Sequence, residues 1–240
     1  MKSKTTADLP TLQALVEAGT HFGHRRERST PAAQKYTFVV RDGVSVINLE
    51  ETQRQLLEAV HYLEEKISGG ATILFVGTKR QAAKTIKDVA ARVGMPSVST
   101  RWLGGTLTNF AVIRKNIDRL VSIEKILSDE ALRTNHTKRE LARMQDAADK
   151  LHTNLDGVTE MTRLPDILLV VDPHEEQTAI REANRMGIPV IALCDTDVNP
   201  DAFFLPIPAN DDAPKAIELI LNFLGDAVVR GKEKQKTPTA

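Results

Sequence analysis

Basic side chains gather in stretches of this sequence where neither helical nor strand spacing accounts for them. They are Arg25, Arg26, Arg28, Lys79, Arg80 and Arg101. The planar guanidinium fork of an arginine matches two phosphate oxygens at once, and a lysine supplies a compact positive charge. These residue types therefore predict contacts to the phosphates of a nucleic acid. Trp102 beside Arg101 either stacks on a base or anchors its own loop, and both interpretations stay open.

Half of these side chains belong to a stretch, 72–110, that predicts one edge of a parallel sheet. An apolar run at 73–76 ends at Gly77, and the apolar spacing is then helical until Gly94. A strand–loop–helix–strand unit has this pattern. Its first loop lies at a helix start, where free N–H groups and the helix dipole favour an anion. The loop 101–109 leaves the next strand at the same edge, so the two loops together predict a phosphate site.

The residues before this unit predict smaller elements. Asp8 is a candidate N-cap for a short helix, and the stretch 20–36 has no period, so a long irregular loop is expected there. Asp42-Gly43 between two β-rich runs is typical of a hairpin turn. A helix capped by Asn48 follows and ends at Gly69.

Residues 109–155 carry two helical seams that are separated by a polar stretch at 128–137. The first seam contains Phe110, Ile113, Ile117, Leu120 and Leu127, and the second contains Leu141, Met144, Ala148, Leu151 and Leu155. Alternating spacings of three and four residues are typical of a coiled-coil seam. We therefore expect an antiparallel αα-hairpin whose two helices pair with each other.

Three further apolar runs predict strands that alternate with helices. They lie at 166–171, 188–193 and 203–208. Five strands in all predict an α/β fold, a doubly wound parallel sheet with the αα-hairpin inserted at its middle. The expected domains are a sheet domain at 9–108 and 156–230 and a coiled-coil hairpin at 109–155, with disordered tails at 1–8 and 231–240.

Motifs for catalysis are incomplete. The sequence lacks the patterns G-x-G-x-x-G, G-x-x-x-x-G-K-[ST] and G-x-S-x-G. Cys194 is better interpreted as a core residue than as a nucleophile. His21 and His24, with Asp195 and Asp197, make only a weak metal pattern that contains no cysteine ligand. No metal, cofactor or catalytic residue is therefore expected.

The net charge of zero conceals a split along the chain. Residues 1–150 hold 24 basic and 17 acidic side chains, residues 151–226 hold 4 and 14, and residues 227–240 hold 4 and 1. This asymmetry suggests that one face meets a polyanion, with chance clustering on a solvated surface as the alternative. No apolar run reaches the roughly 20 residues of a membrane helix. The single cysteine excludes an internal disulfide, and the start has no secretory pattern, so a cytoplasmic protein without a membrane partner is expected.

Seven motifs stand out along the chain. They are THFGH followed by a basic loop, RDGVSVINLEET, ILFVGTKRQA, RWLGGTLTNF, LPDILLVVDP, EANRMGIPVIALCDTDVNPD and IPANDDA. Together they resemble the bacterial-type ribosomal protein S-two family of the small subunit, over residues 12–229. One departure is the run 29–33, Ser-Thr-Pro-Ala-Ala, where the family commonly has tryptophan-asparagine-proline-lysine-methionine.

The resemblance implies a flavodoxin-like sheet domain with a coiled-coil hairpin, in a structural ribosomal component that is not an enzyme. Its implied partners are small-subunit rRNA, neighbouring ribosomal proteins and, in many bacteria, the mRNA-binding protein S-one. The residues that it implies as rRNA-binding are His21, His24, Arg25, Lys79, Arg80, Arg101, Trp102 and Asn109, to which local charge adds Arg26 and Arg28. The alternatives are a nucleotide- or phosphate-binding enzyme on the same fold and an adaptor whose arm binds protein.

Overall fold

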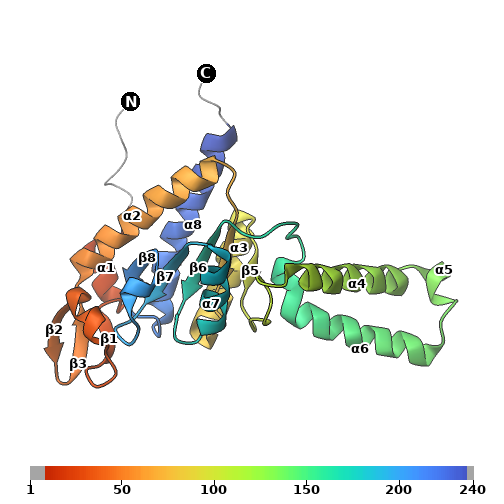
Figure 1. Cartoon of the computed structure of the whole chain (residues 1–240), viewed down its shortest axis with the longest axis horizontal. Helices are drawn as coiled ribbons and strands as arrows, with labels where there is room; N and C mark the ends of the chain where they lie inside the picture. The colour runs from red at the N-terminus through yellow and green to blue at the C-terminus, as the bar shows by residue number, and fades with distance from the viewer. Residues whose placement is uncertain (1–8, 237–240) are drawn as a thin grey trace.

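Apolar runs that are buried on both faces build the central sheet of this protein. The computed structural model describes residues 9–236, and Figure 1 shows the sheet between a small antiparallel sheet and a long two-helix arm. The five strands are β4 (Ile73–Val76), β5 (Ser97–Val98), β6 (Ile167–Val171), β7 (Val190–Cys194) and β8 (Leu205–Pro208). They are parallel and lie in the order β5-β4-β6-β7-β8, which is the flavodoxin-like order. The predicted fold class is confirmed.

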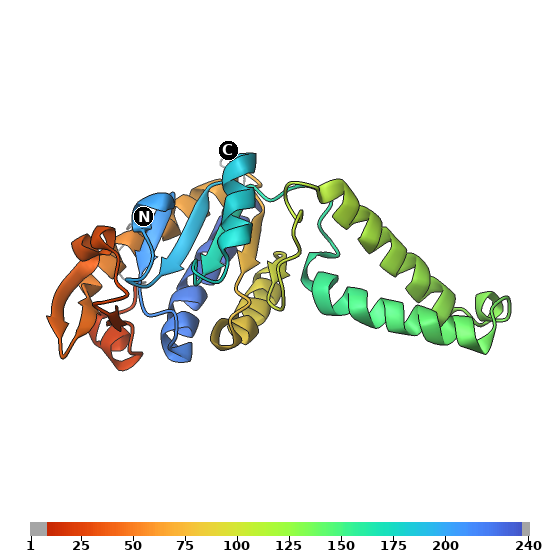
Figure 2. The same ribbon diagram turned by 60° about the horizontal axis from the view of Figure 1, so that its bottom comes forward.

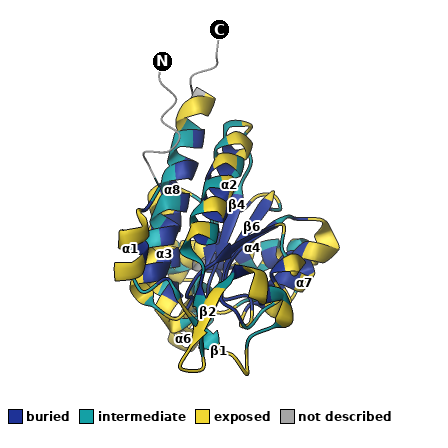
Figure 3. Ribbon diagram, turned by 90° about the vertical axis from the view of Figure 1, so that its left-hand side faces the viewer, coloured by how far each residue is buried: buried dark blue, intermediate teal, exposed yellow. Residues whose placement is uncertain are grey.

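Helices cover both faces of this sheet. Alternate strand residues such as Phe75 and Leu169 pack against α2 (Leu49–Ser68), α3 (Arg80–Val93) and α8 (Pro214–Lys236). Their neighbours Leu74 and Leu168 pack on the opposite face, against α7 (Gln177–Met186) and the root of the arm. The period of two along each strand thus divides the core into two layers, and Figure 3 shows the strands buried between the helices.

The small sheet lies beyond β8, next to the short helix α1 (Leu12–Glu17) (Figure 1). It consists of β1 (Phe22–Arg25), β2 (Thr37–Arg41) and β3 (Val44–Ile47) in the antiparallel order β1-β3-β2. The predicted hairpin turn is confirmed, since Asp42 and Gly43 both have positive φ angles, 52° and 77°.

Two expectations for this region need correction. The stretch 20–36 is not one irregular loop, because four of its residues form β1 and the short 3-10 helix η1 (Pro31–Tyr36) follows. Strand β1 exists through its pairing with β3, which local periodicity does not reveal. Thr11 caps α1 with its side chain, whereas the candidate cap Asp8 lies outside the described residues.

The arm is made of α4 (Phe110–Ser128) and α6 (Lys138–Leu155), joined through the single turn α5 (Glu130–Arg133). Figure 2 shows the two long helices running side by side away from the sheet. Near its middle the arm has its own small core, which contains Leu120, Ile123 and Ala148. At the root, Ile117 and Leu155 belong to the core of the sheet instead. A coiled-coil supercoil in this arm stays a prediction.

The C-terminal helix corrects a further boundary. Helix α8 continues to Lys236, so residues 231–236 are not part of a disordered tail. Lys232 donates hydrogen bonds to the carbonyl oxygens of Val93 and Gly94 at the end of α3, and Lys234 forms an ion pair with Glu64. The tails predicted at 1–8 and 237–240 lie outside the described residues. Within residues 9–236, no helix has the length and apolar character needed to span a bilayer.

Candidate nucleic-acid interface

Lys79 follows β4 at the carboxyl ends of the parallel strands, where the sequence predicts an anion site. We call this end of the sheet, with the loops that leave β4 to β8, the strand-exit edge. The Lys79 ammonium lies 2.8 Å from Asp172, 3.0 Å from Asp211 and 2.6 Å from Asp212. Burial lowers the pKa of Lys79, but its ion pairs with these carboxylates outweigh burial and hold the pKa above its usual value.

The carboxylates around Lys79 are held in place as firmly as the lysine. Asp172 has a φ of 59°, a left-handed conformation that is uncommon for residues other than glycine. Its Oδ1 accepts the N–H groups of His174 and Glu175, while Oδ2 faces Lys79. Burial and the neighbouring Asp172 raise the pKa of Asp211 to about 7, against the opposing effect of Lys79. The lysine is therefore already neutralised within the chain.

The backbone N–H group that precedes Lys79 is also occupied. Thr78 donates its N–H to Oε1 of Glu176 at 2.6 Å, and Glu176 is buried at the start of α7. Burial raises the pKa of Glu176. The anion that the helix start was expected to bind is thus a carboxylate of the protein itself.

The loop 101–109 binds a second internal carboxylate. Oε1 of Glu182, on α7, accepts hydrogen bonds from the indole N–H of Trp102 at 3.0 Å and from the N–H of Gly105 at 2.8 Å. Its Oε2 accepts from the N–H groups of Leu107 and Thr108 and from the Thr108 hydroxyl. Burial raises the pKa of Glu182, but these hydrogen bonds outweigh burial and hold the pKa below its usual value.

Much of the phosphate site expected at the strand-exit edge is therefore engaged within the chain, and of its predicted cations Arg80 and Arg101 stay exposed. Both loops do present N–H groups suited to an anion, and Glu176 and Glu182 fill them from the same helix. Of the two interpretations of Trp102, the hydrogen bond to Glu182 favours the loop anchor. The pairing of both glutamates with these loops was not predicted, and its only indication in the sequence was the acidic excess of the second half.

His24 joins the small sheet to the end of β7. Its Nδ1 lies 2.9 Å from Oδ2 of Asp195, and its backbone N–H donates to Asp195 and to the hydroxyl of Thr196. Contact with the Asp195 carboxylate raises the pKa of His24 to about 9. Gly23 permits this approach, because a Cβ there would lie 2.9 Å from the Ser45 carbonyl oxygen and from Thr196.

Hydroxyl groups fix the basic loop to the same strand end. The Ser29 hydroxyl lies 2.9 Å from that of Ser45 and donates to that of Thr196 at 3.0 Å. Thr30 donates its N–H to the Thr196 carbonyl and its hydroxyl to the Val198 carbonyl. Ser29 and Thr30, in the run that departs from the family pattern, thus hold the basic loop in place through their hydroxyl groups.

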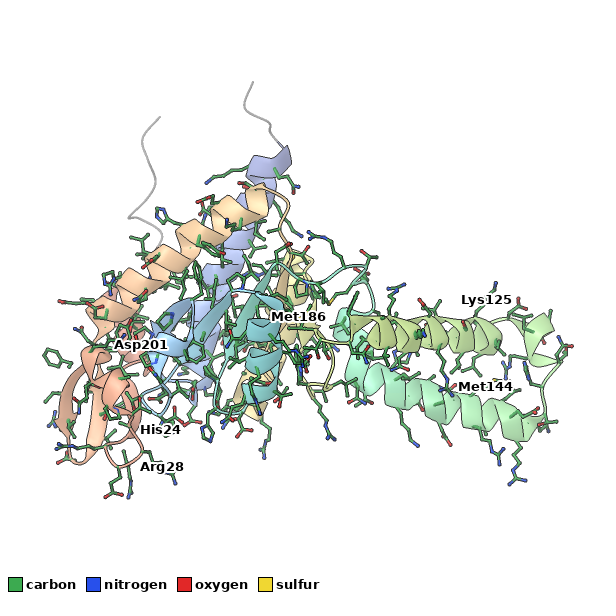
Figure 4. The ribbon with its side chains drawn as sticks, viewed as in Figure 1. His24, Arg28, Lys125, Met144, Met186 and Asp201 are labelled. Carbon is green, nitrogen blue, oxygen red and sulfur yellow. The ribbon has the colours of Figure 1, made fainter. Side chains whose placement is uncertain are left out.

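Arg25, Arg26 and Arg28 extend from this anchored loop into solvent. All three are exposed, and no carboxylate within residues 9–236 forms an ion pair with them. Figure 4 shows Arg28 pointing away from the protein at the end of the molecule where His24 lies. The Arg26 N–H donates to the Gly43 carbonyl, which places the basic loop beside the hairpin turn. These arginines are positioned by the fold and available to a partner.

The remaining predicted contacts lie elsewhere or point inward. Arg80, Arg101 and Asn109 are exposed, at the strand-exit edge and the loop after β5. Because β5 and β8 end the sheet on opposite sides, Arg101 and Asn109 do not form one compact patch with the basic loop. The His21 ring packs on the Phe22 ring, with centroids 4.1 Å apart.

His24 and the nearby aspartates are not arranged as a metal-ligand group. Asp197 Oδ2 lies 4.0 Å from His24 Nε2, and the described part of the chain contains no group of three or more histidine, cysteine or carboxylate side chains arranged to hold a metal ion. Cys194 is buried, as predicted, and burial raises the pKa of its thiol.

The chain is thus an α/β protein with a flavodoxin-like sheet, in which Glu176 and Glu182 engage N–H groups of the strand-exit loops and three exposed arginines extend from the basic loop. Comparison with known proteins gives the family. The family model for ribosomal protein S2 matches residues 15–231, so the chain belongs to the ribosomal protein S2 family, whose members are structural and not enzymes. The resemblance inferred from the motifs is confirmed.

Two relatives show how far this similarity extends. The small ribosomal subunit protein uS2 of Rhodopirellula baltica is 42% identical over 229 residues, which cover 95% of this chain and 88% of that protein. The protein of the same name from Fusobacterium nucleatum is 42% identical over 223 residues, covering 93% and 90%. Their names agree with the expected location on the cytoplasmic ribosome.

Proposed function

We propose that this chain is a structural component of the small ribosomal subunit that binds small-subunit rRNA and neighbouring ribosomal proteins. Family membership supports the ribosomal role. The observation that carries rRNA binding is the set of three exposed, unpaired arginines on the anchored loop, Arg25, Arg26 and Arg28. The protein S-one stays a prediction of the resemblance.

Of the residues predicted to bind rRNA, the exposed ones are proposed as direct contacts. Arg25, Arg26 and Arg28 form the principal group, and Arg80, Arg101 and Asn109 form a second, separate group. Lys79, His24 and Trp102 act indirectly, because their polar atoms are engaged by carboxylates of the chain and hold the loops that carry the contacts. His21 contributes by supporting Phe22.

The salt dependence of rRNA binding tests this assignment. Each phosphate contact that is lost should lower the log–log slope of affinity against salt by roughly 0.7 to 0.9. Changing Arg25, Arg26 and Arg28 together to alanine should therefore lower the slope by about 2 to 3 for a transcript of small-subunit rRNA. The free energy of unfolding should change by less than about 0.5 kcal/mol per site, because these side chains are exposed and unpaired.

A matched control is the pair Arg181→Ala and Arg185→Ala, on the exposed side of α7 in the acidic half. This control should leave the slope unchanged. An equal fall in slope for the control and the triple variant would contradict the proposed rRNA surface.

A further inference from the structure

The outer face of the small sheet is exposed and combines apolar and basic side chains. Strand β3 alternates, with Ser45 and Ile47 buried toward the protein and Val44 and Val46 only partly covered on the other side. The register therefore defines two rows of side chains across the outer face. One row is Phe22, Val46 and Val39, and the other is Arg25, Val44 and Arg41.

Two phenylalanines are unusually exposed on this sheet. Phe38 has 74% of its surface exposed and Phe22 has 54%. The register shift between Thr37 and Val39 leaves Phe38 as the extra residue of a bulge, so Phe38 and Val39 both oppose Val46. Figure 3 shows β2 exposed over most of its length, in agreement with the four exposed residues of this strand, 38–41. Aromatic surface of this kind is costly to leave in water unless a partner covers it.

The basic side chains next to these rings indicate what kind of partner this face binds. Arg25 and Arg41 flank Val44 in the second row, and Arg26 is held at the adjoining turn by its bond to Gly43. Among the described residues, the only acid within ion-pair distance of any of these arginines is Asp42, 3.9 Å from Arg41 with both side chains almost fully exposed. Aromatic faces beside a line of exposed cations suit an unpaired nucleic acid strand, whose bases stack while its phosphates meet arginines.

We propose that the outer face of the β1-β3-β2 sheet binds an unpaired segment of RNA, with bases stacked on Phe22 and Phe38 and phosphates on Arg25 and Arg41. The inference rests on the proposed rRNA-binding function and deepens it from phosphate contact to recognition of single-stranded RNA. The His21 ring packed on Phe22 holds one stacking surface in place before binding. A duplex cannot use this face in the same way, because its bases are already stacked inside the helix.

The experiment compares a short labelled oligouridylate with a short RNA duplex, using the full-length chain. The variants Phe22→Ala and Phe38→Ala should each weaken oligouridylate binding roughly 5- to 150-fold, the range that corresponds to loss of a stacked base. Affinity for the duplex should be unchanged by either variant. Phe38→Leu separates stacking from general apolar contact, since leucine keeps apolar surface but has no aromatic face, and it should also lose affinity.

A matched control is Phe204→Leu. Phe204 has the same exposed fraction as Phe22, 54%, but lies outside the small sheet and packs on Tyr62. This variant should bind both probes as the unchanged protein does. Thermal unfolding of Phe38→Leu should match the unchanged protein, because the side chain is so exposed, so a loss of binding by this variant reports on the face and not on folding.

Each other outcome overturns the inference in a distinguishable way. Unchanged oligouridylate affinity for Phe38→Leu, with duplex binding that still depends on Arg26 and Arg28, overturns the stacking face and leaves the proposed function standing. Failure of the unchanged protein to bind either RNA overturns both. If Phe38→Leu releases another ribosomal protein from purified small subunits but binds oligouridylate normally, the face is a protein-docking surface and the inference is wrong.

Discussion

The strand-exit edge and the small sheet with its basic loop carry the same kinds of residues but differ in how their charges are used. At the strand-exit edge, Lys79 is surrounded by three carboxylates and Glu182 fills the loop 101–109. On the basic loop, Arg25, Arg26 and Arg28 have no partner among the described residues. A cation or a nest of N–H groups is available to an external anion only where no carboxylate of the chain has been placed against it.

The difference also explains the charge split along the chain. Part of the acidic excess in residues 151–226 is turned inward, since Asp172, Glu176, Glu182, Asp195 and Asp211 are all buried. Their partners come from the first half, in Lys79, His24 and the loop 101–109. The halves of the chain thus partly neutralise each other at the strand-exit edge, whereas the three arginines of the basic loop stay exposed.

The largest effect should come from Glu182→Ala, which would leave four buried or half-buried N–H groups without an acceptor. Unpaired buried donors are costly, and the lost hydrogen bonds are to a charged carboxylate, so we expect the free energy of unfolding to fall by about 3 to 5 kcal/mol. Urea unfolding measures this change. Glu175→Ala, at an exposed position nearby, is the control and should change little; equal effects for both would show that Glu182 does not hold the loop.

Lys79→Met should be the next in size. It leaves Asp172, Asp211 and Asp212 together without their cation, so we expect a loss of about 2 to 4 kcal/mol at neutral pH. The loss should shrink as the pH falls from 7 to 5, because protonation removes the repulsion among the carboxylates. The salt slope of rRNA binding should not change. A lower slope with unchanged stability would mean that Lys79 contacts phosphate and that the two regions do not differ as described.

A third variant, Leu120→Asp, tests whether the arm unfolds independently of the strand-exit edge and the small sheet. Leu120 is buried in the small core of the arm, apart from the sheet core that contains Ile117. We expect the outer arm to unfold locally, with faster amide hydrogen exchange in α4 and α6 and unchanged protection in β4 and β6. Val121→Asp, at a neighbouring exposed position, should leave exchange in the arm as it was. Loss of protection in the sheet would show that arm and sheet unfold as one unit.

The smallest effect concerns pH, through the His24 contact that joins the two regions. Because the folded pKa of His24 is raised from 6.5 to about 9, its stabilising contribution is fully present below pH 6.5 and is lost as the pH rises through 9. We expect the unfolding free energy to fall by about 2 kcal/mol over this window, after allowance for partial exposure. Because the pKa of Asp211 is raised from 3.8 to about 7, its destabilising effect builds up as the pH rises from about 4 to 7 and is largely complete before most of the His24 decline.

The matching measurement is urea unfolding at several pH values for His24→Gln and for His61→Gln, whose side chain is exposed. The His24 variant should lack the decline between pH 6.5 and 9, and the His61 variant should keep it. A decline that persists in His24→Gln would assign the pH dependence to other groups.

Much of the fold could be predicted because local patterns carry it. The runs that became β4, β6 and β7 are buried on both faces, and such continuous apolar runs are visible in the sequence without any partner. Strand β1 could not be found in this way, since its four residues Phe-Gly-His-Arg show no alternation and are extended only through pairing with β3. The last turns of α8 could not be found in this way either. They are stabilised by the contact of Lys234 with Glu64 and by the hydrogen bond from Lys232 to the end of α3.

For the candidate site, the sequence determined which chemistry is present, and the tertiary structure decided which of it is available. Residue types and loop positions were enough to predict that Thr78, Lys79 and the loop 101–109 suit an anion. The anion is in fact Glu176, Glu182 or an aspartate of the same chain. These contacts join residues about 75 to 130 positions apart in the sequence, as between Glu182 and Thr108 or between Lys79 and Asp211. Electrostatic pairing acts over a few ångströms of space and is indifferent to distance along the chain, so only the folded arrangement could show that Lys79 is neutralised while Arg28 is exposed.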